Sequence, residues 1–488
     1  MMRSLYSGIS GLSVHQTKMD VIGNNIANVN TVGFKASRVA FSDVFYQTVQ
    51  SATGPNESTG AAGQNAMQIG LGSTVSSIVA SPTKTGGAQR TDNPFDIMIN
   101  GDSFFIVNQG GTNYFTKAGD FKVDADGNLC TSSGATVMGW QVDPKDATKT
   151  VADVVSPLRI MAPENQYSTP VATTNTYISG NIDSKDTQLA LTGTGKTVNI
   201  SFYDKLGESY SATFKIIHSG TGTPPTAIEN QYDVQLVDVL DSQGNSVFVK
   251  KTVDASTGNV TYASSGLSGS SFAGTSLAYN VDATTGAVSF TNAMPTLTFN
   301  AATGKFVGIG SATSTDKAID LKLGATAATN HFSDIKVDFS TITMYAGSGS
   351  TTLGSAMGDL NGLGKGRKAG NMTGLSVDTS GKIYGTYSNG DNRLLGQIAV
   401  ASFSNPAGLE SKGGNLFAET QNSGKFDGIG HDVKSDGGSF TTGVLEMSNV
   451  DLAAEFTEMI TTQRGFQANS RIITTSDTLL EELINLKR

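Results

Sequence analysis

The chain has very little of what disulfide chemistry or strong electrostatic binding would need. Cys130 is the single cysteine among 488 residues, so no intrachain disulfide and no cysteine-based metal cluster can form. It is most simply a small residue in a β-hairpin, with a reactive thiol as the alternative. Charged residues make up only 15% of the chain, below the usual quarter or so, and the formal net charge is −9. Without a basic patch or polybasic run, the sequence argues against binding to nucleic acid or to an anionic membrane surface.

Long apolar segments are also missing. The first 20 residues, MMRSLYSGISGLSVHQTKMD, lack the continuous apolar core of a secretory signal. No stretch reaches the ~18 apolar residues of a membrane span. We therefore expect no membrane insertion and, for an extracellular protein, export without a cleaved signal peptide.

The sequence shows no active site. The four histidines, His15, His218, His331 and His431, lie far apart and have no metal-ligand spacing. No nucleophile elbow, Cys-His pair or distinctive carboxylate pair is visible, although sequence alone leaves a Ser/His/Asp triad open. We expect no enzymatic activity, no cofactor and no bound metal.

Three glycine-containing segments resemble ligand-binding motifs without completing them. In ALTGTGKT (190–197), Ala190 stands where a phosphate-binding loop needs glycine, and a strand pattern follows. GLGKGRKAG (362–370) has no strand before it and no helix after it, as a dinucleotide site would need. DADGN (124–128) lacks a ligand before the glycine and the distal glutamate of a calcium loop. Turns or flexible loops are expected at all three.

What the chain does contain is glycine, 57 residues of 488, and an amphipathic helical pattern at each end. From Leu5 to Ile26 four apolar residues lie seven apart, the spacing of a coiled-coil seam: Leu5, Leu12, Met19 and Ile26. After residue 448 a second set has the same spacing: Leu452, Met459, Phe466, Ile473 and Leu480. Ser448 or Asn449 is expected to cap the second helix, and the first should end between Asn28 and Gly33.

Each seam must be buried against the other or against another copy of the chain, because the sequence between them is not helical. The residues we assign to self-assembly are Leu5, Ile9, Leu12, Met19, Ile22, Asn24, Asn25, Ile26, Asn28, Leu452, Phe456, Met459, Phe466, Ile473, Leu480 and Leu483.

Asn24, Asn25 and Asn28 are unexpected in such a helix, because the short amide competes for backbone hydrogen bonds. We interpret them as polar residues that fix the register of packed helices at some cost in stability. Asn24 and Asn28 lie one turn apart, where their amides can reach a neighbouring helix. The alternative is that they only fray and cap the helix end.

Between the two ends the pattern is almost wholly β, with alternating runs broken by turn signals such as Asn100-Gly101 and Asp126-Gly127. We predict a mainly β, multidomain chain with discontinuous segments. Its expected parts are a helical domain resembling a coiled coil (1–30 and 448–488), polar connectors (31–75 and 424–447), an inner β domain (76–150 and 339–423) and one or two inserted outer β domains (151–338).

Several long segments resemble the bacterial flagellar axial proteins, the rod and hook group. SGISGLSVHQTKMDVIGNNIANVNTVGFK resembles their N-terminal signature, and EMSNVDLAAEFTEMITTQRGFQANSRIITTSDTLLEELINLKR the matching C-terminal one. NPFDIMINGDSFFIVNQGGTNYFTKAGDFKVDADGNL and GLSVDTSGKIYGTYSNGDNRLLGQIAVASFSNPAGL resemble the inner β domain of this group. The length and the large middle insertion resemble its hook members more than its distal-rod members.

This resemblance implies a structural subunit of a flexible helical tube that couples the flagellar motor to the filament and has a central export channel. The implied partners are further copies of the chain, the distal rod protein at the base, the hook cap during assembly, the hook–filament junction protein at the tip and the flagellar type III export apparatus. The implied location is the extracellular hook. The alternatives are a distal rod protein, which forms a straight tube, and a secreted β-rich adhesin or carbohydrate-active enzyme, which leaves both terminal seams unexplained.

Overall fold

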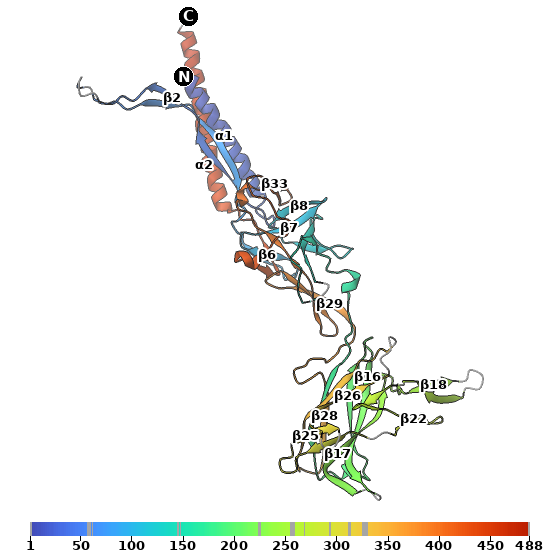
Figure 1. Ribbon diagram of the computed structural model, residues 1–488. Coiled ribbons are helices and arrows are strands. Elements are labelled where there is room, and N and C mark those ends of the chain that lie inside the picture. Colours follow the sequence, from blue (N-terminus) through green and yellow to red (C-terminus); the bar gives the residue numbers. More distant parts are fainter. Residues whose placement is uncertain are drawn as a thin grey trace. The chain divides into compact units, whose positions relative to one another are not determined.

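The computed structural model describes residues 2–55, 60, 62–143, 146, 148–222, 226–253, 259–267, 269–291, 294–310, 314–324 and 330–486. The chain divides into two compact units. Unit 1 comprises Met1–Gln166, Thr373–Thr386 and Asn392–Arg488, and unit 2 comprises Tyr167–Met372 and Tyr387–Asp391. Unit 1 therefore holds both ends of the chain, and unit 2 is an insertion within it (Figure 1).

The predicted fold class is confirmed: strands dominate the described residues, with one α-helix at each end. The helices are α1 (Met2–Ala27) and α2 (Leu452–Asn485). Four single-turn 3₁₀ helices are η1 (Pro163–Asn165), η2 (Thr187–Leu189), η3 (Pro406–Gly408) and η4 (Val433–Asp436). Neither α1 nor α2 combines the length and apolar character needed to cross a bilayer, and the same is true of every other described helix.

The helix ends differ slightly from expectation. Asp451, not Ser448 or Asn449, caps α2, because its carboxylate accepts hydrogen bonds from the backbone N–H groups of Ala453 and Ala454. The first helix, α1, ends at Ala27, one residue before the predicted interval from Asn28 to Gly33, and Gly33 has a φ of 70°.

Unit 1 contains a β domain whose main sheet has the local strand order β30-β31-β11-β7-β8-β34-β33. Its strands are β5 (Ala88–Arg90), β6 (Ile97–Asn100), β7 (Phe104–Gln109), β8 (Thr112–Thr116), β9 (Phe121–Val123), β10 (Leu129–Thr131), β11 (Thr136–Gln141), β12 (Ser156–Pro157), β30 (Lys382–Tyr387), β31 (Asn392–Ile398), β32 (Val400–Ala401), β33 (Glu410–Gly413), β34 (Leu416–Ala418), β35 (Ser439–Thr442) and β36 (Val444–Glu446). Aromatic residues fill its core, where Phe115 meets Phe403 edge-on at 4.7 Å between ring centres. Trp140, the one tryptophan of the sequence, is buried there.

Unit 2 consists of two sheets and two separate hairpins. Its strands are β13 (Tyr167–Ser168), β14 (Asn175–Ile182), β15 (Lys196–Tyr203), β16 (Ser209–Thr221), β17 (Thr226–Leu240), β18 (Val249–Val253), β19 (Val260–Ser264), β20 (Ser271–Phe272), β21 (Thr275–Ser276), β22 (Tyr279–Val281), β23 (Val288–Phe290), β24 (Thr296–Phe299), β25 (Phe306–Gly310), β26 (Ala318–Lys322), β27 (Ile335–Met344) and β28 (Thr352–Met357), and β29 (Gly370–Val377) leads back to unit 1. The sheets β15-β16-β17-β24-β25 and β21-β20-β26-β27-β14-β28 share one hydrophobic core. The inserted region thus has a single core of its own.

The predicted edges of the insertion differ from these units. Residue 338 falls inside β27, whose alternation of buried and partly buried side chains continues to Met344. Both predicted connectors also carry strands: 31–75 contains β1 (Ser37–Asp43), β2 (Tyr46–Gln50), β3 (Met67–Gly70) and the start of β4 (Ser73–Ala80), and 424–447 contains β35 and β36. The assignment of these parts to separate domains stays a prediction.

Five turns are built on the same Asp-x-x-Gly pattern. In each, the aspartate carboxylate accepts hydrogen bonds from the backbone N–H groups two and four residues later, at Asp124, Asp204, Asp241, Asp359 and Asp378. The DADGN segment is the first of them, so it is a hairpin turn, as expected. ALTGTGKT leads directly into β15, again as expected.

Candidate self-assembly site: the terminal helices and their junction

The two terminal helices form an antiparallel pair in unit 1. Gly8 lies against Ile473, Gly11 against Asn469, and Gly465 against His15. A Cβ atom on Gly11 or Gly465 would come within 2.8 Å of Asn469 or 2.7 Å of His15, so these glycines allow the helices to approach closely. Glycines, Asn469 and His15 therefore share this contact with Ile473, one of the predicted seam residues.

Charged groups flank this contact. Lys18 of α1 lies 3.0 Å from Glu458 of α2. Burial, and then the charge of Lys18, lower the pKa of His15, so a neutral imidazole packs against Gly465 at pH 7. The His15 ring also meets Phe41 of β1 edge-on, at 6.0 Å between ring centres. The hairpin β1–β4 thus packs on the same part of α1.

The three asparagines have different environments. Asn25 is buried; its Nδ2 donates to Ser37 O at 2.9 Å and to Glu455 Oε1 at 3.0 Å, and its Oδ1 accepts from Ser37 N at 3.0 Å. Asn28 donates instead to the carbonyl and side-chain oxygens of Asn24 at the helix end. Asn25 therefore joins α1 to α2 and β1 within one chain, whereas Asn24 and Asn28 bond locally. Their role in register between chains stays a prediction.

We expect Asn25→Ala to destabilise unit 1 by about 1–3 kcal/mol, because a buried N–H and carbonyl of Ser37 and the Glu455 carboxylate lose a partner. Urea unfolding followed by the helical circular-dichroism signal measures this loss. Asn24→Ala is the matched control on the exposed side of the same turn, and we expect it to cost well under 1 kcal/mol. Equal losses for the two variants would contradict the assignment of Asn25 as the structural residue.

The predicted seam residues are only partly covered within one chain. Ile22 and Asn25 are buried, whereas Leu5, Leu12, Met19, Ile26, Asn28, Met459, Phe466, Ile473 and Leu480 are half-buried and Ile9, Asn24, Leu452, Phe456 and Leu483 are exposed. The uncovered apolar side chains of α2 are between 39% and 82% exposed: Leu452, Phe456, Ile460, Ile472, Leu479, Leu483, Ile484 and Leu486. Since Gly8 lies against Ile473, the last turns of α2 extend past the start of α1 (Figure 1). We name these eight exposed apolar residues, Leu452 to Leu486, the α2 apolar surface.

A second exposed apolar region was not expected from the sequence. β2 and β3 pair only with each other, and their side chains are exposed, among them Tyr46, Val49, Met67 and Ile69. In Figure 1 the β2 hairpin extends away from the helix pair. A two-stranded ladder is marginally stable alone in water, so this hairpin also needs a surface to cover it.

A buried ionic cluster joins the helix pair to the β domain. Lys35 and Glu446 form an ion pair at 2.7 Å with both side chains fully buried. Lys35 Nζ also donates to Lys84 O at 2.8 Å, and Glu446 Oε1 accepts from Gly86 N at 2.9 Å. The segment after α1 is thereby tied to the segment before α2.

Asn449 strengthens the same junction. Its Oδ1 accepts from Ala36 N at 2.7 Å, and its Nδ2 donates to Ser81 O at 3.2 Å and Lys84 O at 3.0 Å. Sequence reasoning missed Lys35, Glu446 and Asn449 as a group because Lys35 is separated from the other two by more than 400 residues along the chain. The one available signal was that each lies inside a motif carrying the family resemblance.

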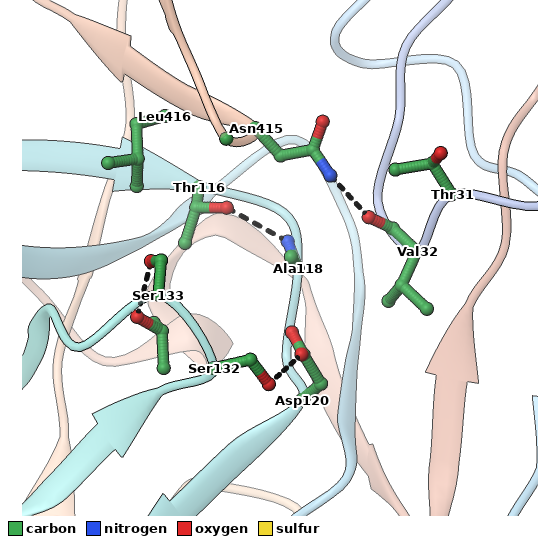
Figure 2. A pocket seen from close by; sticks show the side chains of 11 residues that line it. Thr31, Val32, Thr116, Ala118, Asp120, Ser132, Ser133, Asn415 and Leu416 are labelled. Atoms are coloured by element: carbon green, nitrogen blue, oxygen red, sulfur yellow. Dashed lines mark hydrogen bonds between the residues drawn. The ribbon is translucent and has the colours of Figure 1, made fainter. Parts of the chain in front are cut away.

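A hollow of about 260 Å³ adjoins this junction. It is lined by Thr31 and Val32, by the end of β8 and the loop after it, and by two further turns, as Figure 2 shows. Asn415 donates to Val32 O at 2.7 Å across it, and Ser132 donates to Asp120. Within the described ranges no three His, Cys, Asp or Glu side chains gather as a metal site would need. The hollow is thus a gap between the post-helix segment and the β domain, and five of its eleven lining residues carry a hydroxyl group.

Family models match three parts of the chain. The flagella basal body rod protein model matches residues 5–35, the model of the flagellar hook protein FlgE/F/G D1 domain matches residues 98–178, and the flagellar basal body rod FlgEFG protein C-terminal model matches residues 441–486. The first and last cover the helix pair and the junction, including Lys35 and Glu446.

Whole-chain relatives agree with these matches. The flagellar hook protein FlgE of Borreliella burgdorferi is 36% identical, and that of Treponema pallidum 33% identical, over 100% of this chain and 100% of each relative. The flagellar basal-body rod protein FlgG of Bacillus subtilis is 26% identical over 100% of both chains. The higher identity to hook proteins supports the hook interpretation over the rod alternative.

Among solved structures, the chain is similar to a Helicobacter pylori flagellar hook protein FlgE2, with 13% identity and a TM-score of 0.39 over 74% of this chain and 100% of that one, a score too low to support an argument. The assignment depends on sequence identity over the whole length. This chain belongs to the flagellar hook protein family.

Proposed function

We propose that the chain is the subunit of a flexible helical tube, and that its terminal helices join neighbouring copies to form the wall around a central export channel. The observation that carries the proposal is the α2 apolar surface. α1 packs on α2 through glycines and polar groups and leaves Phe456, Ile460 and Leu483 uncovered. Large apolar side chains left exposed in groups are typical of a protein–protein contact.

The geometry favours open rather than closed assembly. The uncovered residues near the start of α2 and those near its end lie at opposite ends of a 34-residue helix, about 50 Å long at ~1.5 Å per residue. When unlike patches meet and the rotation does not close, a helical filament grows. Further copies of the same chain are the partner that such a surface fits best.

The remaining partners follow from membership of the family. We propose contacts with the distal rod protein at the base, the hook cap during assembly and the hook–filament junction protein at the tip. We also propose a location in the extracellular hook after type III export without a cleaved signal peptide. A structural role without enzymatic activity, cofactor or metal is part of the same proposal.

The test is the double variant Phe456→Asp/Leu483→Asp of the full chain, imaged by electron microscopy under polymerising conditions. Charges on the α2 apolar surface should abolish tubes, because burying a carboxylate in an apolar contact is costly. Unfolding followed by Trp140 fluorescence should be unchanged, since both residues are exposed in the single chain.

Two further double variants complete this experiment. Gln463→Asp/Gln467→Asp places the same charges on exposed polar positions of α2 and should leave the tubes intact. Asn24→Ala/Asn28→Ala should reduce tube formation if these amides fix register between copies. Normal tubes from the Phe456/Leu483 variant would overturn the proposed assembly surface, and normal tubes from the asparagine variant would overturn only the register role.

A further inference from the structure

Three ionisable groups are buried together where the segment after α1 crosses the β domain. Besides the Lys35–Glu446 pair, Lys117 has a fully buried side chain, and its Nζ donates to Gly101 O at 2.6 Å and lies 5.0 Å from the centre of the Phe104 ring. Two ammonium groups and one carboxylate are thus buried in this region. Burial, and then the charge of Lys35, lower the pKa of Lys117 to about 8, while Glu446 and Asp102 act in the opposite direction. We name Lys35, Lys117 and Glu446 the junction cluster.

The Glu446 carboxylate can accept more hydrogen bonds than it does. Its Oε1 accepts from Lys35 Nζ and Gly86 N, whereas its Oε2 is buried without a hydrogen-bond partner among the described residues. An unsatisfied buried carboxylate oxygen costs free energy, because a carboxylate normally accepts several hydrogen bonds. Gly33, two residues before Lys35, donates its N–H to Glu446 O and packs on Ala118, the residue after Lys117, so the three groups lie in one region of unit 1.

The backbone between these groups packs closely on Ala118 and borders the hollow. Gly33 donates its N–H to Glu446 O at 2.8 Å, and a Cβ on Gly33 would lie 2.7 Å from Ala118 N. Residues 31 and 32, just before it, line the hollow together with Thr116 and Ala118, the neighbours of Lys117 (Figure 2). The hollow therefore leaves space beside residues 31 and 32, at the start of the 31–36 segment.

We propose that Glu446 is a shared carboxylate that pairs with Lys35 in one state of the 31–36 segment and with Lys117 in another. The exchange breaks one buried ion pair and forms another, so neither state leaves Glu446 without a cation. It gives the helix pair two attachments to the β domain, the kind of bistable element that a bending polymer needs in its subunits. This device goes beyond self-assembly, and its test does not require polymers.

The first test is a double-mutant cycle of Lys35→Met and Lys117→Met in the full chain. Urea unfolding at pH 7 is followed by fluorescence of Trp140, which lies in the β domain of unit 1. If Lys117 replaces Lys35, then Lys35→Met alone should raise the unfolding equilibrium constant only modestly. The double variant should raise it at least about tenfold beyond the product of the single effects, because Glu446 then has no cation. Lys122→Met, at an exposed lysine of β9, is the matched control and should change little.

The second test is the pH dependence of the same unfolding. In the wild type, Lys117 is deprotonated above about pH 8 when folded but remains protonated to near pH 10.5 when unfolded. The unfolded chain then binds more protons, so raising the pH from 8 to 10 should lower the unfolding constant about tenfold or more. This increase in stability between pH 8 and pH 10 should vanish in Lys117→Met. It should vanish also in Lys35→Met, because Lys117 paired with Glu446 keeps its proton.

An additive cycle, or an alkaline gain that persists in Lys35→Met, would overturn the exchange. Failure of Lys35→Met to fold would overturn it too, since the proposal requires Lys117 to take the place of Lys35.

Discussion

Replacing Glu446 with glutamine should cost unit 1 about 3–5 kcal/mol, the loss typical of a buried ion pair that loses one partner. The amide keeps the shape of the side chain but leaves the buried Lys35 ammonium without its carboxylate, and it removes one of the two carboxylates whose charge acts on Lys117. The Gly86 N–H retains an acceptor, so the change acts mainly through charge. Urea unfolding of the full chain, followed by Trp140 fluorescence, measures the loss.

The matched control is Glu410→Gln, which removes the carboxylate from an exposed ion pair with Lys412. Exposed pairs contribute little, so this variant should unfold within about 0.5–1 kcal/mol of the wild type. A Glu446→Gln variant as stable as the Glu410→Gln variant would mean that the junction cluster does not hold the helix pair to the β domain. We also expect Glu446→Gln to form fewer and shorter tubes, because it loosens the attachment of the helices that assemble.

Excising unit 2 should leave tubes that form but do not bend. Tyr167 and Ser168 pair with Asn371 and Gly370 in an antiparallel ladder. Residues 169–369 can therefore be replaced by Asn-Gly, the sequence of a two-residue hairpin turn. Unit 1 retains its own aromatic core and both terminal helices. The expectation is that inner helices keep the tube continuous, while the inserted domains supply the weak, exchangeable outer contacts that bending requires.

Electron microscopy of the polymers gives the measurement, with the curvature of wild-type tubes as the reference. The Trp140 unfolding transition of the excised variant should match that of the full chain and serves as the control for folding. Curved, supercoiled tubes from the excised variant would contradict the role assigned to unit 2. A folded variant that forms no tubes would instead place an essential assembly contact in unit 2.

Local patterns in the sequence were sufficient for the elements at each end. The apolar spacing from Leu5 to Ile26 predicted α1, and Gly33 marked a point just beyond its end. The Asp-Gly pair at Asp126-Gly127 predicted a turn. The turn forms because the Asp124 carboxylate accepts hydrogen bonds from the backbone N–H groups of Asp126 and Asn128. Such features depend only on residues a few positions apart, so they can be inferred without knowing the fold.

The partner of each helix face could not be inferred in this way. The spacing of seven placed Leu5, Leu12 and Met19 on one face of α1. Gly8 and His15, which lie against α2, follow Leu5 and Leu12 by three residues and so belong to that same face. Glycine gives no signal in an apolar pattern, and its effect appears only when a second helix lies against it. Asn25 was grouped with Asn24 and Asn28 for the same reason: their positions on the helix are similar, but only Asn25 meets Ser37 and Glu455.

By itself the sequence determined the mainly β class, the two terminal helices and, through long motifs, the flagellar family. Those conclusions depend on composition, periodicity and runs of neighbouring residues. Only the tertiary structure decided that Lys35, Lys117 and Glu446 are buried together, that the helices meet through glycines, and that the α2 apolar surface is left uncovered. The physical reason is that burial and ion pairing are properties of groups brought together from distant parts of the chain, and no local pattern records which groups those are.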